Sequence, residues 1–121
     1  MRRGRPSTCL VAGEKIARYG FGEGHPFGPD RHDAFIRELK AEALDGIVEP
    51  LEPRAATRTE LETFHASAYV ELVADRSRTG QGYLDAGDTP AFRGVFEAAS
   101  NVVGASLVAT EAIMEDRKSV V

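Results

Sequence analysis

The sequence predicts an α/β fold, because short apolar runs that suit buried strands alternate with segments whose apolar residues recur at helical spacing. Residues 8–12 are the first such run, residues 30–46 the first amphipathic segment, and Ile47 and Val48 the next short run. The order strand, helix, strand favours a parallel pair with a right-handed crossover. A chain of 121 residues is long enough for one ordinary domain.

The first third of the chain predicts a strand, a shaped loop and a helix. Residues 8–12 form a strand that Gly13 ends. Residues 19–29 hold four glycines and two prolines, a density that excludes regular structure. Asp30 can cap the helix that follows, and Gly46 can stop it.

Two further helices follow the second strand, which we expect just before Pro50. Thr57 and Glu60 have the spacing of a capping box, and apolar residues then recur at three and four through to about residue 75. After a polar, glycine-containing loop, Pro90 suits the start of a last helix, whose many apolar and small residues predict burial on most sides.

Two short parallel strands make an incomplete sheet. They leave unpaired edges and two faces to cover, so such a pair is marginal without more strands. The chain therefore reads as the opening part of a larger domain. The alternative is a stand-alone, non-enzymatic domain that uses its sheet edges to dimerise or to bind a partner strand.

Composition excludes several classes of protein. The net charge of −4 argues against a nucleic-acid-coating role, and polar residues interrupt the most apolar stretch, residues 95–114, so it is a poor membrane span. The single cysteine, Cys9, cannot build a disulfide framework, and the start lacks the apolar stretch of a secretory signal. We expect a soluble, cytoplasmic protein.

Four ordered motifs resemble the histone deacetylase family, especially its bacterial acetoin-utilisation and acetylpolyamine deacetylase-like members. The first is the run at residues 19–31, Tyr-Gly-Phe-Gly-Glu-Gly-His-Pro-Phe-Gly-Pro-Asp-Arg. The others lie within residues 60–70, 87–94 and 97–107, in the family's order. Together they extend the resemblance from Thr8 to Met114.

This resemblance implies the N-terminal portion of an arginase/deacetylase-like fold, with a mostly parallel sheet flanked by helices. Members of the family hydrolyse acetamides with a bound zinc. Their metal ligands, an Asp-x-His and a later Asp, and their catalytic His-His pair follow the part that residues 1–114 match. We therefore assign no catalytic or metal-binding residue, expect this chain to be inactive alone, and expect zinc only in a full-length parent.

The last residues, 115–121, do not continue the family pattern. They read like translated adapter sequence, which indicates a truncated reading frame and a non-native tail; a natural charged tail is the alternative. The acyl substrate also stays open between acetyl-lysine in a protein, an acetylpolyamine and another small amide.

Three residues are candidates for substrate binding. The resemblance implies that Asp88 accepts hydrogen bonds from the substrate backbone at the rim of the acetyl-lysine tunnel, a task that suits a carboxylate. Its alternative role is an N-cap for the helix expected at Pro90. His25 and Pro26 match the loop that forms part of the active-site wall, and the alternative for His25 is a structural histidine that bonds to backbone.

Two further residues match the family's inner channel, through which acetate can leave. Arg31 could bind a carboxylate there with its guanidinium, and Tyr19 lies nearby in sequence; an ion pair on the helix surface is the alternative for Arg31. The Asp-x-His string that ends at His32 opens a helix and does not follow a strand, so we read it as a chance match. His65 is expected to pack against its helix, since no zinc-binding pattern surrounds it.

Overall fold

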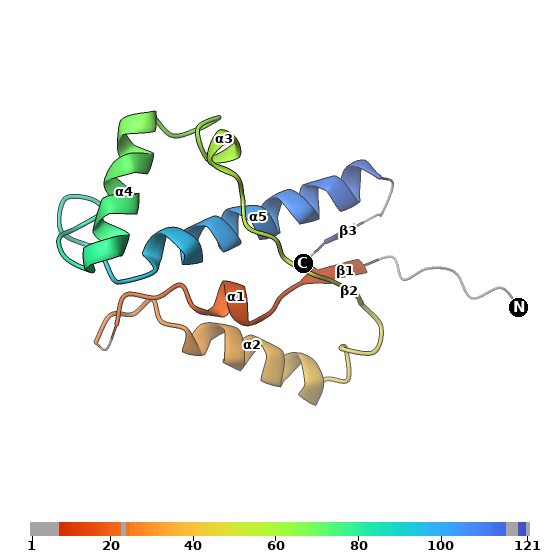
Figure 1. Ribbon diagram of the computed structural model, residues 1–121. Coiled ribbons are helices and arrows are strands. Elements are labelled where there is room, and N and C mark those ends of the chain that lie inside the picture. Colours follow the sequence, from red (N-terminus) through yellow and green to blue (C-terminus); the bar gives the residue numbers. More distant parts are fainter. Residues whose placement is uncertain (1–7, 23, 116–118, 121) are drawn as a thin grey trace, which may run out of the picture.

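A small parallel sheet with helices around it makes up the part of the chain that the computed structural model describes, residues 8–22, 24–115 and 119–120 (Figure 1). The elements in chain order are β1 (Thr8–Val11), α1 (Glu14–Ala17), α2 (Asp30–Ala41), β2 (Glu49–Leu51), α3 (Arg58–Leu61), α4 (Ser67–Thr79), α5 (Val95–Met114) and β3 (Ser119–Val120).

The sheet has the strand order β2-β1-β3, and β1 pairs in parallel with both neighbours. Cys9 lies opposite Glu49 on one side and Val120 on the other. The predicted α/β class and the parallel pair are confirmed. The position of the second strand was wrong, because Ile47 is 63% exposed and the strand runs through Pro50 instead. Pro50 is tolerated there because β2 is an edge strand.

The sequence predicts a non-native tail at residues 115–121. Of these, residues 116–118 and 121 lie outside the described part of the chain. Between them, residues 119 and 120 form β3 beside β1. The non-native origin of residues 115–121 stays a prediction.

Helix α2 differs from its prediction at both ends. Asp30 is its first residue and does not cap it, because Pro29 holds the N-cap position with φ −68°. The helix ends at Ala41, before Gly46, and Ala43 adopts a left-handed φ of 57°. The preceding single turn, α1, was not predicted, because four residues are too few to show a helical period.

The predicted helix after the capping box is two helices. The capping box itself is confirmed: the Thr57 side chain accepts from the backbone of Glu60, whose carboxylate accepts from the Thr57 N–H. However, α3 ends after one turn at Leu61 and α4 starts at Ser67. The apolar repeat was misleading because Phe64, which it counted as a core position, is 88% exposed.

Helix α5 crosses the molecule, with α4 on one side and α1 on the other (Figure 1). It starts at Val95, later than the predicted start at Pro90, after Gly94 with φ 86°. Ser77 of α4 takes the place of a local cap, since its Oγ accepts from the N–H of Phe96 at 3.0 Å. The helix is less buried than predicted: six of its 20 residues are buried, and Ile113 and Met114 at its end are 53% and 81% exposed.

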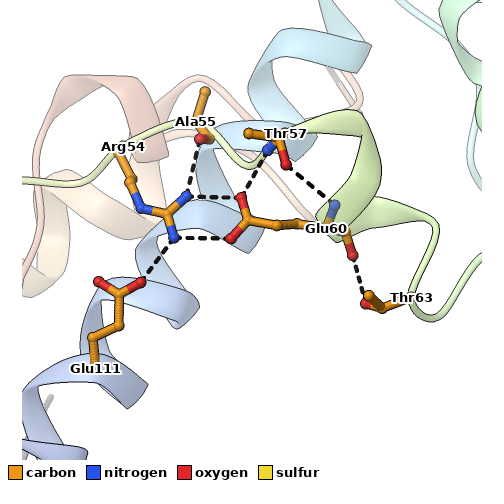
Figure 2. A network of polar contacts seen from close by, with 6 residues as sticks. All are labelled: Arg54, Ala55, Thr57, Glu60, Thr63 and Glu111. Atoms are coloured by element: carbon orange, nitrogen blue, oxygen red, sulfur yellow. Dashed lines mark hydrogen bonds and ion pairs between the residues drawn. The ribbon is translucent and has the colours of Figure 1, made fainter.

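Arg54 ties the segment before α3 to α5 (Figure 2). Its guanidinium donates to both carboxylate oxygens of Glu60 and to Oε1 of Glu111, each at 2.9 Å. Next to it, the N–H of Ala56 donates to the carbonyl of Ser100 at 2.9 Å. The main core lies beside these contacts and consists of Ala56, Leu61, Val70, Phe96, Val103 and Leu107.

No helix in the described ranges is both long enough and apolar enough to cross a membrane.

Candidate functional site

The loop that follows α4 is built as a tight hairpin around Asp88. Tyr83 and Pro90 form an antiparallel bridge, and the N–H of Leu84 donates to the carbonyl of Thr89 at 2.8 Å. The hydroxyl of Tyr69 on α4 donates to the carbonyl of Leu84 at 3.2 Å. This bond anchors the loop to α4 at Leu84.

Asp85 organises the tip of this loop. Its Oδ1 accepts from the N–H groups of Gly87, Asp88 and Thr89, each at 3.0 Å. These bonds, above all those from Thr89 and Gly87, lower the pKa of Asp85 to about 2. Sequence reasoning missed this residue, although an Asp two positions before a Gly in a polar loop is a known turn signal.

His25 connects the glycine-rich loop to the Asp85 turn. Its Nδ1 lies 3.0 Å from the N–H of Phe27, and its Nε2 lies 3.0 Å from the carbonyl oxygen of Asp88. The ring also packs against Phe21, with centroids 4.8 Å apart. The bonds to backbone match the structural alternative that the sequence left open for His25.

Asp88 presents its side chain outward. Its N–H is bonded to Asp85 and its carbonyl to His25, whereas its side chain is 90% exposed. The expected alternative as a helix cap is wrong, because α5 starts at Val95 and Gly94 is its N-cap residue. The structure thus brings two predicted site residues, His25 and Asp88, together, with Pro26 exposed beside them.

Tyr19, at the start of the glycine-rich loop, is partly buried, whereas Arg31, in the first turn of α2, is exposed. Tyr19 packs edge-on against Phe21, Phe27 and Phe92, with centroids 5.2 to 6.2 Å apart. Its pKa is raised, first by burial and then by the charge of Tyr69. The Arg31 guanidinium stacks on the Phe27 ring at 4.4 Å.

A cavity of about 570 Å³ is lined by both Tyr19 and Arg31, together with residues of β1, α1 and α2. The structure therefore brings these two predicted channel residues together as well.

The described residues do not fit a zinc ion. Across residues 8–22, 24–115 and 119–120, no three His, Cys, Asp or Glu side chains converge on one point. The Nε2 atom of His32 accepts from the N–H of Gly13, and His65 contacts the rings of Phe64 and Tyr69. The Asp-x-His string at residues 30–32 is part of α2 and gathers no further ligands.

The sequence and the structure both resemble known proteins. The family model of the histone deacetylase domain matches residues 25–121. Acetoin utilization protein AcuC of Bacillus subtilis (strain 168) is 33% identical over 114 residues, which cover 88% of this chain and 30% of AcuC. Histone deacetylase HDAC1 of Drosophila melanogaster is 27% identical over 110 residues, 84% of this chain and 21% of HDAC1.

Among solved structures, the HDA15 HD domain matches with a TM-score of 0.80 and 27% identity, over 93% of this chain and 33% of that chain. This chain therefore spans about a third or less of the length of the proteins it matches. The order of strands and helices, the paired loops at His25 and Asp88 and these matches agree with one another, and the chain belongs to the histone deacetylase family.

Proposed function

We propose that this chain supplies the substrate-facing N-terminal part of a zinc-dependent deacetylase, which hydrolyses an acetylated amine such as acetyl-lysine or an acetylpolyamine. Asp88 holds an N–H group of the substrate, and His25 and Pro26 form the adjoining wall. The observation that carries the proposal is the state of Asp88, whose backbone is bonded on both sides while its side chain is 90% exposed.

The chemistry of Asp88 suits this role. A carboxylate accepts charge-assisted hydrogen bonds from two N–H donors at once, and these are stronger than neutral ones. Because the loop is already ordered by its own hydrogen bonds, substrate binding does not have to order it. Family membership supports an acetylated amine as the ligand.

The cavity beside Tyr19 and Arg31 suits the acetate that deacetylation would release. A guanidinium binds a carboxylate through two parallel N–H bonds, and the cavity that Arg31 lines has room for acetate. We propose that these two residues line the inner channel.

Catalysis needs groups other than those described. In the parent enzyme zinc would activate a water molecule, but the described residues form no site for it. We therefore propose that the metal ligands and the acid-base pair come from outside residues 8–114 and that this chain alone is inactive. We also propose that the protein is cytoplasmic and does not bind nucleic acid; the net charge of −4 supports the second point.

The test is a chimera in which residues 8–114 replace the matching segment of Drosophila HDAC1, assayed on an acetyl-lysine peptide. We expect the chimera to be active and Asp88→Asn to raise KM about tenfold, because the charge-assisted bonds are lost. Asp45→Asn, at another exposed aspartate, is the matched control. If the chimera is active and Asp88→Asn leaves its KM unchanged, the proposed role of Asp88 in substrate binding is wrong.

A stand-alone interaction domain is the second candidate. One observation favours it: β2 and β3 each have one neighbour in the described sheet, so each offers a free edge to another strand. Sedimentation of the purified chain over a range of concentrations tests it. A reversible dimer favours the interaction domain, and a chain that stays monomeric over the whole range favours the deacetylase part.

A further inference from the structure

We propose that His25 is a positioning residue: its neutral ring, with the proton on Nε2, fixes the backbone of Asp88 so that the Asp88 carboxylate faces outward, and a second proton on the ring releases this loop. The importance of this for substrate binding rests on the proposed function, whereas the hydrogen-bonded lock itself does not.

The contacts of the ring determine where its proton lies. The N–H of Phe27 donates to Nδ1 at 3.0 Å, so Nδ1 must carry a lone pair. The proton of the neutral ring is then on Nε2, which donates to the Asp88 carbonyl at 3.0 Å. His25 is 19% exposed and both ring nitrogens are engaged, so the ring holds the loop and has no nitrogen left for a ligand.

Asp85 holds the other side of Asp88. Asp85 accepts a hydrogen bond from the N–H of Asp88, which belongs to the peptide group before the Asp88 Cα. His25 binds the carbonyl of Asp88, which belongs to the peptide group after that Cα. With both peptide groups held, the direction of the Cα–Cβ bond is fixed. The adjacent Gly87, at φ 129°, would otherwise let this turn change conformation easily.

Acid acts on the two anchors differently. Asp85 stays ionised down to a pH of about 2, since three backbone N–H groups stabilise its charge. A second proton on His25 goes to Nδ1 and faces the N–H of Phe27, donor against donor. The contact with Phe27 then becomes repulsive, so the ring shifts, and its Nε2–H leaves the Asp88 carbonyl for the Asp88 carboxylate.

The charged groups around His25 act in the same direction. The Asp88 Oδ1 atom lies 3.9 Å from Nε2, so a charged ring attracts this carboxylate and draws it inward, away from a ligand. Asp85 is occupied by its three N–H donors. Arg31, at the start of α2, is stacked on Phe27. Protonation therefore both loosens the loop and turns the Asp88 carboxylate away from its outward position.

Nuclear magnetic resonance on the full chain tests the lock without any activity assay. Long-range proton–nitrogen spectra at neutral pH should show His25 with a protonated Nε2 and a bare Nδ1. On acidification, the amide signals of Phe27, Gly87, Asp88 and Thr89 should shift together, with the midpoint of His25. A proton on Nδ1 at neutral pH, or loop shifts that follow another group, would overturn the proposal.

Three substitutions separate the two bonds of the ring. Gln at position 25 keeps a donor near the place of Nε2, Asn keeps an acceptor near the place of Nδ1, and Phe keeps only the packing on Phe21. We expect His25→Phe and His25→Asn to speed hydrogen exchange of the loop amides about tenfold, and His25→Gln to restore slow exchange without the acid response. His65→Gln, at a histidine that contacts Phe64 and Tyr69, should leave that response in place.

The chimera with Drosophila HDAC1 then separates this proposal from the proposed function. His25→Phe should raise KM several-fold with little change in kcat, and His25→Gln should recover most of the loss. An active chimera whose KM is unchanged by His25→Phe overturns the positioning role but not the proposed function. An inactive, folded chimera whose His25 still shows the lock overturns the proposed function but not the lock.

Discussion

Gly104 of α5 lies directly against the carbonyl oxygen of Arg54, and a Cβ at Gly104 would overlap that oxygen. The neighbouring bond from the Ala56 N–H to the Ser100 carbonyl holds the same segment against the helix. A glycine at this point of α5 lowers helix propensity, but it permits the close approach on which the core around Leu61 depends.

Gly104→Ala should therefore destabilise the chain by about 2 to 4 kcal/mol, because the backbone of residues 54–56 must move away from α5. Urea denaturation measures this. Gly46→Ala is the matched control, since a Cβ at Gly46 meets nothing within 4 Å, and it should leave the midpoint nearly unchanged. Equal midpoints for the two variants would contradict the close approach.

Ser77→Ala should cost about 1 to 2 kcal/mol of folding free energy. The Ser77 hydroxyl is buried, accepts from the N–H of Phe96 and donates to the Glu97 carboxylate, so its loss leaves that N–H without its acceptor. Thermal unfolding measures the effect. Ser106→Ala removes an exposed hydroxyl that bonds within its own helix, and it should be nearly neutral.

Acid should weaken the chain partly through Glu60. Bonds from Arg54, and then from the Thr57 backbone, lower its pKa from 4.5 to about 2. Because the folded state lowers this pKa, the stabilisation is complete above pH 4.5 and is lost as the pH falls towards 2. Glu60→Gln should flatten the decline of Tm over this window, whereas Glu42→Gln, at an exposed glutamate, should not. A decline of the same steepness in both variants would count against Glu60.

Removing Asp85 should free the loop but leave the fold intact. Asp85→Ala takes the acceptor from the N–H groups of Gly87, Asp88 and Thr89, so their hydrogen exchange should accelerate about tenfold or more. Amides of α4 should keep their protection. Asp45→Ala serves as the control at an exposed site. Unchanged exchange at residues 87–89 would show that the turn does not depend on this carboxylate.

Zinc should neither stay with the purified chain nor stabilise it. The described residues bring no three ligands together, and a metal raises Tm only if it binds the folded state more tightly than the unfolded chain. Dialysis followed by metal analysis, and unfolding with and without added zinc, measure this. Stoichiometric zinc after dialysis, or activity of the chain on an acetyl-lysine peptide, would contradict our view that catalysis needs other residues.

Patterns in the sequence correctly predicted features that depend on residues close together in the sequence or on the order of the elements. The capping box at Thr57 and Glu60 was correct because its bonds join residues three apart. The parallel pair of strands was correct because the order strand, helix, strand favours it, although the second strand lies slightly later than predicted. The same kind of pattern gave wrong predictions where contacts between residues distant in the sequence determine burial or the start of a helix. Phe64 has the spacing of a core residue but lies exposed, and α5 starts at Val95 because Ser77 of another helix caps it.

The candidate site shows the same division. The motifs brought Asp88, His25, Tyr19 and Arg31 to attention, and the structure places them in two neighbouring groups. Sequence spacing could not reveal that His25 bonds to the backbone of Asp88, since 63 residues separate them. The Asp85 turn had a local signal, but a polar loop contains many such residues, and only the three N–H contacts distinguish it.

The central position of β1 affects the order in which this chain can fold. Its register pairs Thr8 with Ser119, so in this chain, whatever the origin of residues 115–121, the middle strand gains its second neighbour only after α5 has been synthesised. The contacts between α4 and α5 close much shorter loops and can form first, since non-local pairing is slow. Until then a ribosome-bound chain exposes a strand edge at β1 that chaperones or other nascent chains can bind.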